Sequence, residues 1–191
     1  MCGRYYIESD IPDEKLTAIV NMMEKNYPGG YKIGEIFPSD KAPALIESNG
    51  RIIAVPAVFG LPGFQDGRLL INARSETASE KRTFSESVRT KRMILPATGF
   101  FEWSHHDSEK TKYLFTIDSH HVIYLCGVYK IVEGEYRFAI LTRQANESMI
   151  DIHDRMPIIA AELEVRSYLS DYESAMRIIS EEAPELSRTL A

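Results

Sequence analysis

Residues 92–103, RMILPATGFFEW, form the apolar run from which the fold of this chain is most readily inferred. Its aromatic and branched side chains are typical of β-strands. Three runs further along have the same character and are joined by short turns such as Glu133-Gly134. They are KYLFTID (112–118), HVIYLCGVYKIV (121–132) and YRFAILTR (136–143). These runs predict neighbouring strands within one β-rich domain.

Upstream of this run, the pattern predicts one helix followed by more strands. The helical pattern opens at Ile11-Pro12, with Pro12 suited to a first turn, and ends at the NYPGG segment, residues 26–30. Its apolar face consists of Leu16, Ile19, Val20 and Met23. The strands are ALIES (44–48), RIIAVPAVFG (51–60) and RLLINAR (68–74).

The remaining segments favour helices at the margins of the sheet. Residues 75–92 indicate a surface helix or helical loop, residues 146–150 a short helix, and residues 161–190 a helical tail. Together these elements predict a single β-rich α+β domain over residues 1–191, with a bent or barrel-like mixed sheet and helices at its margins.

Composition narrows the classes of protein to consider. The chain has 191 residues, 44% hydrophobic, and its longest apolar stretches fall short of the roughly 20 residues of a membrane helix. Nothing at the start resembles a signal peptide, and two cysteines make no disulfide framework, so we expect a cytoplasmic protein with Cys126 in the core. A net charge of −6 argues against a protein that binds nucleic acid over its whole surface by electrostatic attraction. A nucleic-acid site would instead be a local groove built from specific arginines.

The first four residues, Met1-Cys2-Gly3-Arg4, suggest unusual chemistry. Removal of Met1 would leave an α-amine and a thiol on one residue, with reference pKa values of about 7.7 to 8.0 and about 8.5. Such a residue can attack a carbonyl twice. The alternative is that Cys2 simply lies in a frayed terminus.

Three internal segments set polar residues in strand-like surroundings: INARSET (71–77) with Asn72, GFFEW (99–103) with Glu102, and IHDRMP (152–157) with His153. Each residue alone has a structural explanation: Asn72 as a turn residue, Glu102 as a surface charge and His153 as a helix-end residue. Together with Cys2 they supply a nucleophile, a carboxylate, an imidazole and an amide, the inventory of an active site.

These segments, taken in order, resemble the SOS response-associated peptidase (SRAP) family. The resemblance runs from Cys2 to about Ile159. It is carried by MCGR (1–4), INARSET (71–77), RTKRMILPATGFFEW (89–103), and FAILTRQAN (138–146) followed by IHDRMP (152–157). It implies the β-rich SRAP fold, binding to single-stranded DNA, and covalent trapping of abasic sites through Cys2 after loss of Met1. It places Asn72, Glu102 and His153 around Cys2 and implies no cofactor.

The chemistry of an abasic site fits this assignment. The ring-opened sugar carries an aldehyde, with which the Cys2 amine would form an imine before the thiol closes a thiazolidine. Glu102 and His153 are suited to the proton transfers, and Asn72 to orienting the amine or sugar. The imine also acidifies the neighbouring sugar carbon, so strand cleavage with His153 as base is expected as a secondary activity.

Contacts to DNA are expected from arginines and aromatic residues. Arg4, Arg74 and Arg155 are suited to holding phosphates, while the alternative is that they neutralise acids such as Glu76 and Asp154. Stacking on bases is expected from three aromatic residues: Trp103, Phe59 and Phe64.

The chain departs from the family pattern at two places. Members commonly show W-G-L-x-P-x-W where this chain has Phe59 and Phe64, and the usual asparagine-containing segment is replaced by EIFPSDKAPAL (35–45). Both changes affect the expected stacking and groove width rather than the Cys2 chemistry.

Metal binding is not expected. The pairs His105-His106 and His120-His121 flank one strand, but no cysteine or spaced carboxylate completes a ligand set. A covalent trap also needs no second subunit, which favours a monomer.

Two other functions remain open. An N-terminal nucleophile hydrolase, either a peptidase or a glutamine amidohydrolase, would use the freed Cys2 thiol with its own amine as base. A DNA-binding module without covalent chemistry would use Cys2 only as a contact. The family name itself points to peptidase activity, including autocatalytic removal of Met1.

Overall fold

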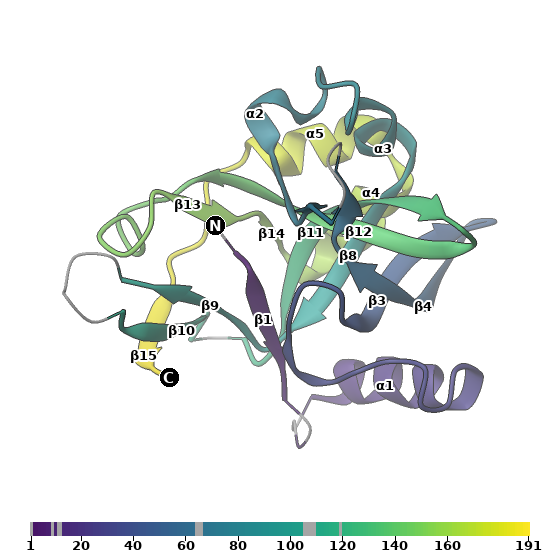
Figure 1. Cartoon of the computed structure of the whole chain (residues 1–191), viewed down its shortest axis with the longest axis horizontal. Coiled ribbons are helices and arrows are strands. Elements are labelled where there is room, and N and C mark those ends of the chain that lie inside the picture. The colour runs from purple at the N-terminus through teal and green to yellow at the C-terminus, as the bar shows by residue number, and fades with distance from the viewer. Residues whose placement is uncertain (1, 9, 11–12, 64–66, 105–109, 119) are drawn as a thin grey trace.

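A closed β-barrel is the centre of the molecule (Figure 1). The computed structural model describes residues 2–8, 10, 13–63, 67–104, 110–118 and 120–191. The barrel strands are β3 (Lys41–Ser48), β4 (Arg51–Phe59), β8 (Arg92–Ala97), β11 (Ile123–Val132) and β12 (Glu135–Gln144). Neighbours pair antiparallel around the barrel except where β12 runs parallel to β4 and closes it. The expected barrel-like mixed sheet is confirmed.

A second, antiparallel sheet lies beside the barrel (Figure 1). Its strands, in spatial order, are β15 (Ser187–Leu190), β10 (Lys112–Thr116), β9 (Gly99–Trp103), β1 (Arg4–Ile7) and β2 (Gly34–Ile36). The N-terminal segment that carries Cys2 therefore enters the fold as the neighbour of the strand that carries Glu102.

The apolar run 92–103 joins the two sheets, because it supplies β8 to the barrel and β9 to the second sheet. Between them, the Thr98 backbone N–H donates to the Tyr6 carbonyl at 2.7 Å, and the Thr98 hydroxyl donates to the same oxygen at 3.1 Å. At Gly99 a Cβ atom would lie 2.7 Å from the Phe115 carbonyl oxygen. Only glycine permits this close approach of β9 to β10.

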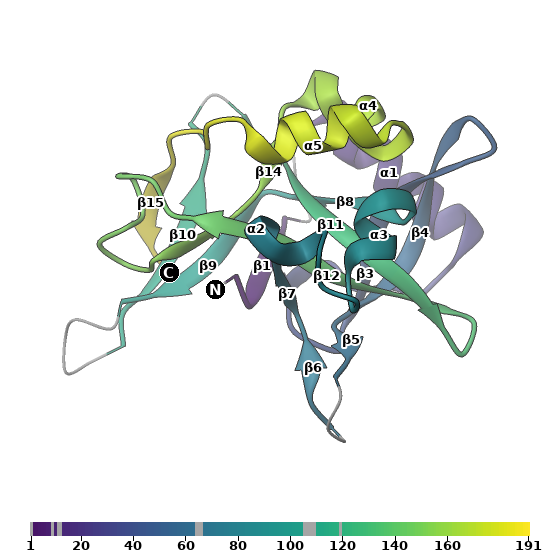
Figure 2. The same ribbon diagram turned by 90° about the horizontal axis from the view of Figure 1, so that it is seen from above.

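Short strands pair with the ends of two barrel strands. They are β7 (Asn72–Arg74) parallel to β12, β13 (Arg155–Pro157) antiparallel to β12, and β14 (Ile159–Ala160) antiparallel to β11. A separate two-stranded sheet, β5 (Leu61–Pro62) paired with β6 (Leu69–Leu70), projects from the barrel (Figure 2). Thr142 of β12 is in register with Arg74 on one side and Pro157 on the other. This end of β12 therefore brings the INARSET and IHDRMP segments together.

The helices lie at the periphery, as expected (Figures 1 and 2). They are α1 (Glu14–Asn26), α2 (Ser75–Ala78), α3 (Ser85–Thr90), α4 (Val165–Ser170), α5 (Tyr172–Ser180) and a 3-10 turn at Glu162–Glu164. Helix α1 begins after Asp13, whose carboxylate accepts from the backbone N–H groups of Lys15 and Leu16 at 2.9 Å, a normal N-cap. Its buried face includes Leu16 and Met23. Within the described residues, no helix is both long and apolar enough to cross a bilayer.

One predicted helical segment is wrong, and the predicted helical tail is confirmed only as far as Ser180. Residues 146–150 form hydrogen-bonded turns, because the Asn146 side-chain oxygen accepts from the Ser148 backbone N–H and hydroxyl and competes with a helix. In the predicted helical tail, α5 ends at Ser180, and Pro184 lies in the segment that leads from it to β15. Strand β15 then satisfies the outer edge of β10 through backbone hydrogen bonds.

Candidate active site

Cys2 and Glu102 lie close together in the interior. Strand β1 pairs with β9 so that Arg4 is opposite Phe101, which puts the start of the chain beside Glu102. Cys2 is fully buried, Glu102 is 4% exposed, and the Cys2 sulfur lies 3.8 Å from the Arg4 carbonyl oxygen. Burial raises the pKa of the Cys2 thiol far above its usual range, and the negative charge of Glu102 raises it further. The thiol is therefore neutral at pH 7.

Asn72 presents an amide whose polar atoms have no partner in the described part of the chain. It lies in β7, opposite Ile140 of β12. Both its side-chain oxygen and nitrogen are buried without a hydrogen bond to any described residue. Leaving such groups unsatisfied costs about 1–3 kcal/mol each. The amide is thus suited to pairing with a polar group that enters the site.

His153 is oriented by the backbone. Its Nδ1 accepts a hydrogen bond from the Arg155 backbone N–H at 2.9 Å, so the neutral ring carries its proton on Nε2. The Asp154 carboxylate also lies 2.9 Å from Nδ1 and can pair with that atom only when Nδ1 is protonated. His153 is 17% exposed, and it lies in the turn before β13, not at the end of a helix. The surroundings can therefore accommodate both protonation states of the ring.

The structure brings these residues together in two pairs. Asn72 and His153 belong to the two segments that flank β12, while Cys2 and Glu102 belong to the paired strands β1 and β9. Figure 1 draws the start of β1 next to β13, and Figure 2 draws β1 next to β7.

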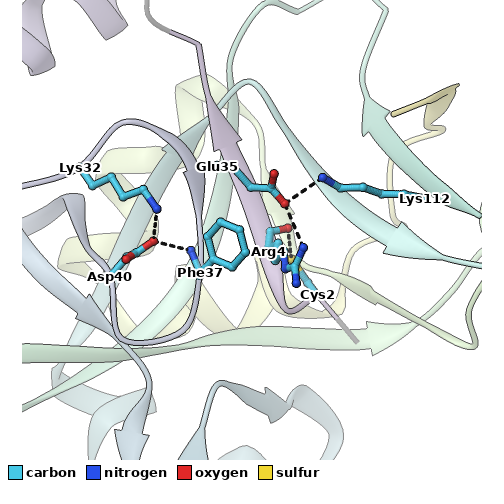
Figure 3. A network of polar contacts seen from close by, with 7 residues as sticks. All are labelled: Cys2, Arg4, Lys32, Glu35, Phe37, Asp40 and Lys112. Atoms are coloured by element: carbon cyan, nitrogen blue, oxygen red, sulfur yellow. Dashed lines mark hydrogen bonds and ion pairs between the residues drawn. The ribbon is translucent and has the colours of Figure 1, made fainter. Parts of the chain in front are cut away.

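Arg4 lies in a network of charges and aromatic rings beside Cys2 (Figure 3). Its guanidinium pairs with Glu35 at 3.2 Å, and Lys112 pairs with the same carboxylate oxygen at 2.8 Å. The guanidinium also lies over the rings of Phe37, at 4.4 Å from the centroid, and Trp103, at 4.8 Å. Partial burial opposes ionisation of Glu35, but hydrogen bonds from Lys112 and Arg4 lower its pKa. One carboxylate is shared by two cations, so these three side chains together carry one net positive charge.

Lys112, Phe37 and Glu35 were not among the predicted site residues. A lysine in a strand and a phenylalanine before a proline carry no signal by themselves. They reach Arg4 only because β1 lies between β2 and β9, a pairing that the sequence pattern does not specify.

The two other predicted arginines have different surroundings. Arg155 is 9% exposed, and its guanidinium forms a bidentate pair with Glu76 at 2.7 and 2.8 Å and donates to the Thr142 carbonyl at 2.7 Å. The alternative role, neutralising Glu76, therefore describes Arg155, and a DNA contact would require this pair to open. Arg74 is exposed and makes no ion pair with any residue that the structure describes.

The predicted stacking residues also differ. Phe59 is fully buried, stacked on Phe138 with ring centroids 5.0 Å apart and met edge-on by Tyr5 at 5.8 Å. Its ring fills the core and is not available to a base, so we leave Phe59 out of the DNA contacts. Trp103 is partly exposed and remains a candidate, whereas Phe64 lies outside the described residues.

The histidine pairs give no metal site in the part of the chain that can be described. His105 and His106 lie outside it, and His120 forms an isolated bridge with Ile117. Among the described residues no group of three or more His, Cys, Asp or Glu side chains is arranged to hold a metal ion.

Comparison with known proteins identifies the family of this chain. Residues 1–187 match the family described as SOS response associated peptidase (SRAP). The abasic site processing protein YoqW of Bacillus subtilis (strain 168) is 32% identical over 183 residues, which cover 89% of this chain and 80% of the relative. The abasic site processing protein YedK of Escherichia coli (strain K12) is 27% identical over 180 residues, which cover 88% and 79%.

Solved structures show the same fold. A phage-related protein from Bordetella bronchiseptica superposes with a TM-score of 0.76 at 20% identity, covering 100% of this chain and 94% of that one. A protein from Bacteroides thetaiotaomicron gives a TM-score of 0.75 at 20% identity, covering 99% and 91%. The family match over residues 1–187 shows that this chain belongs to the SOS response associated peptidase family.

Proposed function

We propose that the mature chain, after loss of Met1, captures abasic sites in single-stranded DNA by forming a covalent bond through Cys2. The observation that carries this proposal is the burial of the Cys2 thiol beside Glu102. The meeting of the segments that hold Asn72 and His153 on either side of β12 supports it. The names of the relatives, abasic site processing proteins, support the same substrate.

The reaction begins with the α-amine that loss of Met1 exposes on Cys2. This amine attacks the aldehyde carbon of the ring-opened sugar, and loss of one water gives an imine. The thiol sulfur then bonds to the same carbon, the electron pair of the C=N bond moves to nitrogen, and the thiol proton is transferred to that nitrogen. The products are a five-membered thiazolidine and water, so no cofactor is consumed.

The environment favours the amine as the first nucleophile. An α-amine with a reference pKa of about 7.7 to 8.0 is partly unprotonated at pH 7, whereas the buried Cys2 thiol is held neutral. The thiol therefore acts second, once the imine has been formed next to it. Ring closure then protects the site from strand cleavage.

The surrounding groups have separate roles in this proposal. Glu102 accepts and returns the protons of the addition and dehydration steps, and Asn72 pairs with the sugar or the amine. His153 is the base for the secondary lyase activity: its Nδ1 gives up the hydrogen bond from the Arg155 backbone N–H to take the proton, and the protonated Nδ1 then pairs with Asp154.

Recognition of the DNA strand is assigned to the surface around Arg4. Arg4, Lys112 and the exposed Arg74 can neutralise phosphates, and Trp103 can stack on an unpaired base. A partly exposed ring with cations beside it suits single-stranded DNA, whose bases are accessible.

The test compares one polypeptide with its Cys2 amine blocked by an N-terminal tag and the same polypeptide after cleavage exposes Cys2. Each is incubated with a single-stranded oligonucleotide containing one abasic site and analysed on a denaturing gel. We expect a resistant complex only after cleavage. Cys2→Ala should abolish it and Cys126→Ala, at the other buried cysteine, should retain it. An equal yield from Cys2→Ala would refute the proposal.

The same preparations test the hydrolase alternative. If exposed Cys2 releases ammonia from glutamine and gives no DNA complex, the protein is an N-terminal nucleophile hydrolase. If DNA binds equally with blocked and exposed Cys2 and never covalently, it is a binding module. Autocatalytic loss of Met1 would appear as a lower intact mass when the purified Met1-bearing chain is incubated alone.

A further inference from the structure

We propose that Arg4 and Lys112 form one phosphate-binding subsite, and that the Glu35 carboxylate occupies it when no DNA is bound. A phosphodiester group of the single strand replaces this carboxylate between the two cations. The inference rests on the proposed function and deepens it, because it names a subsite next to Cys2 and the residue that weakens binding to undamaged strands.

The two cations meet at a single oxygen atom. Arg4 Nη1 lies 3.2 Å and Lys112 Nζ lies 2.8 Å from Oε1 of Glu35 (Figure 3). The three residues come from β1, β10 and β2, so three strands of the second sheet contribute to this point. A phosphodiester, like a carboxylate, carries one negative charge and presents oxygens that accept charge-assisted hydrogen bonds. It can therefore take the same place between the two cations.

Aromatic rings hold both cations independently of the carboxylate. The Arg4 guanidinium lies 4.4 Å from the ring centroid of Phe37 and 4.8 Å from that of Trp103. Lys112 Nζ lies 3.8 Å from the ring centroid of Phe101. A cation over the face of a ring is stabilised there by the ring quadrupole. The two cations thus remain in position when the carboxylate leaves.

Glu35 can leave this place and competes for it as an anion. Its side chain is 27% exposed, so the freed carboxylate can turn into water. Partial burial opposes ionisation of Glu35, but hydrogen bonds from Lys112 and Arg4 lower its pKa, so the side chain is charged at pH 7. An incoming phosphate must displace this charge, which lowers the affinity for any DNA strand.

The subsite borders the residue that reacts. The Cys2 sulfur lies 3.8 Å from the Arg4 carbonyl oxygen (Figure 3). A phosphate held by Arg4 and Lys112 is therefore close to the sugar that Cys2 captures. On an intact strand the competition from Glu35 keeps binding weak and reversible, and the covalent bond retains the protein only where an aldehyde is present.

The test is Glu35→Gln, which keeps the size of the side chain and removes its charge. Binding to an intact single-stranded oligonucleotide, without an abasic site, is measured by fluorescence anisotropy at fixed salt. We expect about fivefold tighter binding, in line with the loss of a partly exposed competing ion pair. Unchanged or weaker binding would overturn the inference, because the carboxylate would then not compete with the phosphate.

The matched control is Glu135→Gln. Glu135 is also shared by a lysine and an arginine, Lys41 at 2.8 Å and Arg137 at 3.8 Å, and its replacement changes the net charge by the same amount. It should leave the affinity within about twofold of wild type. An equal gain from Glu135→Gln would overturn the inference, because it would reveal a general effect of net charge.

A second control removes the two cations. When Arg4→Ala and Lys112→Ala are already present, adding Glu35→Gln should not increase the affinity. A fivefold gain in that protein would also overturn the inference, since the carboxylate would act elsewhere. Failure of wild type to crosslink abasic DNA would instead refute the proposed function, and it would leave this comparison on intact DNA unaffected.

Discussion

Replacing Glu76 with glutamine tests how the structure holds the IHDRMP segment in place. Glu76 forms a bidentate pair with the nearly buried Arg155, at 2.7 and 2.8 Å. A buried charge-assisted hydrogen bond contributes about 1.5–3 kcal/mol, but Glu76 is 49% exposed and glutamine retains one acceptor oxygen. We therefore expect Glu76→Gln to lower the free energy of unfolding by about 1 kcal/mol, or the thermal midpoint by roughly 2–4 °C.

The effect should depend on pH in a defined direction. The hydrogen bond from Arg155 lowers the pKa of Glu76 in the folded state. A carboxylate of this kind stabilises the fold above its unfolded pKa, near 4.3, and loses that contribution as pH falls through the lowered folded value. The difference between wild type and Glu76→Gln should thus be constant above about pH 5 and shrink in more acidic solution.

Urea unfolding of both proteins from pH 3 to pH 7 is the assay. The matched control is Glu86→Gln, which removes a glutamate paired with Lys91 at the surface, where Glu86 is 73% exposed. We expect no measurable change from that control. If Glu76→Gln also equals wild type at pH 7, the pair does not hold this segment and the reasoning is refuted.

Other predictions concern packing, thiol reactivity and DNA contact. Gly99→Ala should lower the free energy of unfolding by about 1–3 kcal/mol in urea titrations, because its Cβ would lie 2.7 Å from the Phe115 carbonyl oxygen; wild-type stability would contradict this. Iodoacetamide should leave Cys2 and Cys126 unmodified in the native Met1-bearing chain at pH 7 and modify both in denaturant, because burial raises the pKa of each thiol. Rapid native labelling would show that the thiols are accessible. Arg4→Ala should weaken binding to single-stranded DNA and reduce the slope of log affinity against log salt by about 0.7, as measured by fluorescence anisotropy; an unchanged slope would remove Arg4 from the interface.

The barrel strands could be predicted because their apolar runs are long and are separated by clear turns. At Glu133-Gly134, for example, both residues have positive φ, 53° and 79°, as expected for a tight hairpin. The pair of strands that closes the barrel could not be predicted, since no local pattern specifies the parallel pairing of β12 with β4.

The C-terminal strand illustrates a different limit. Residues 187–190, SRTL, are mostly exposed and have no apolar alternation. They form β15 because β10 offers an unpaired edge, and the side chains contribute little to that choice. The helix predicted for residues 161–190 therefore extends too far toward the C-terminus.

Part of the candidate site could be predicted from the sequence, because polar residues interrupt otherwise apolar strands there. Glu102 and Asn72 were identified in this way, and the pairing of β1 with β9 explains why Glu102 lies beside Cys2. Phe59 is aromatic, as a base-stacking residue would be, but its ring is buried against Phe138 and Tyr5. Only the folded chain brings these three rings together.

The most direct measurement of the central claim is the mass of the DNA complex and the identity of its modified residue. Mature protein is reacted with an abasic oligonucleotide, digested and analysed by mass spectrometry. The proposed chemistry predicts the sum of the chain without Met1 and the DNA, minus one water, with the adduct on the peptide that begins at Cys2. An adduct on a lysine, or a crosslinked chain that still carries Met1, would contradict it.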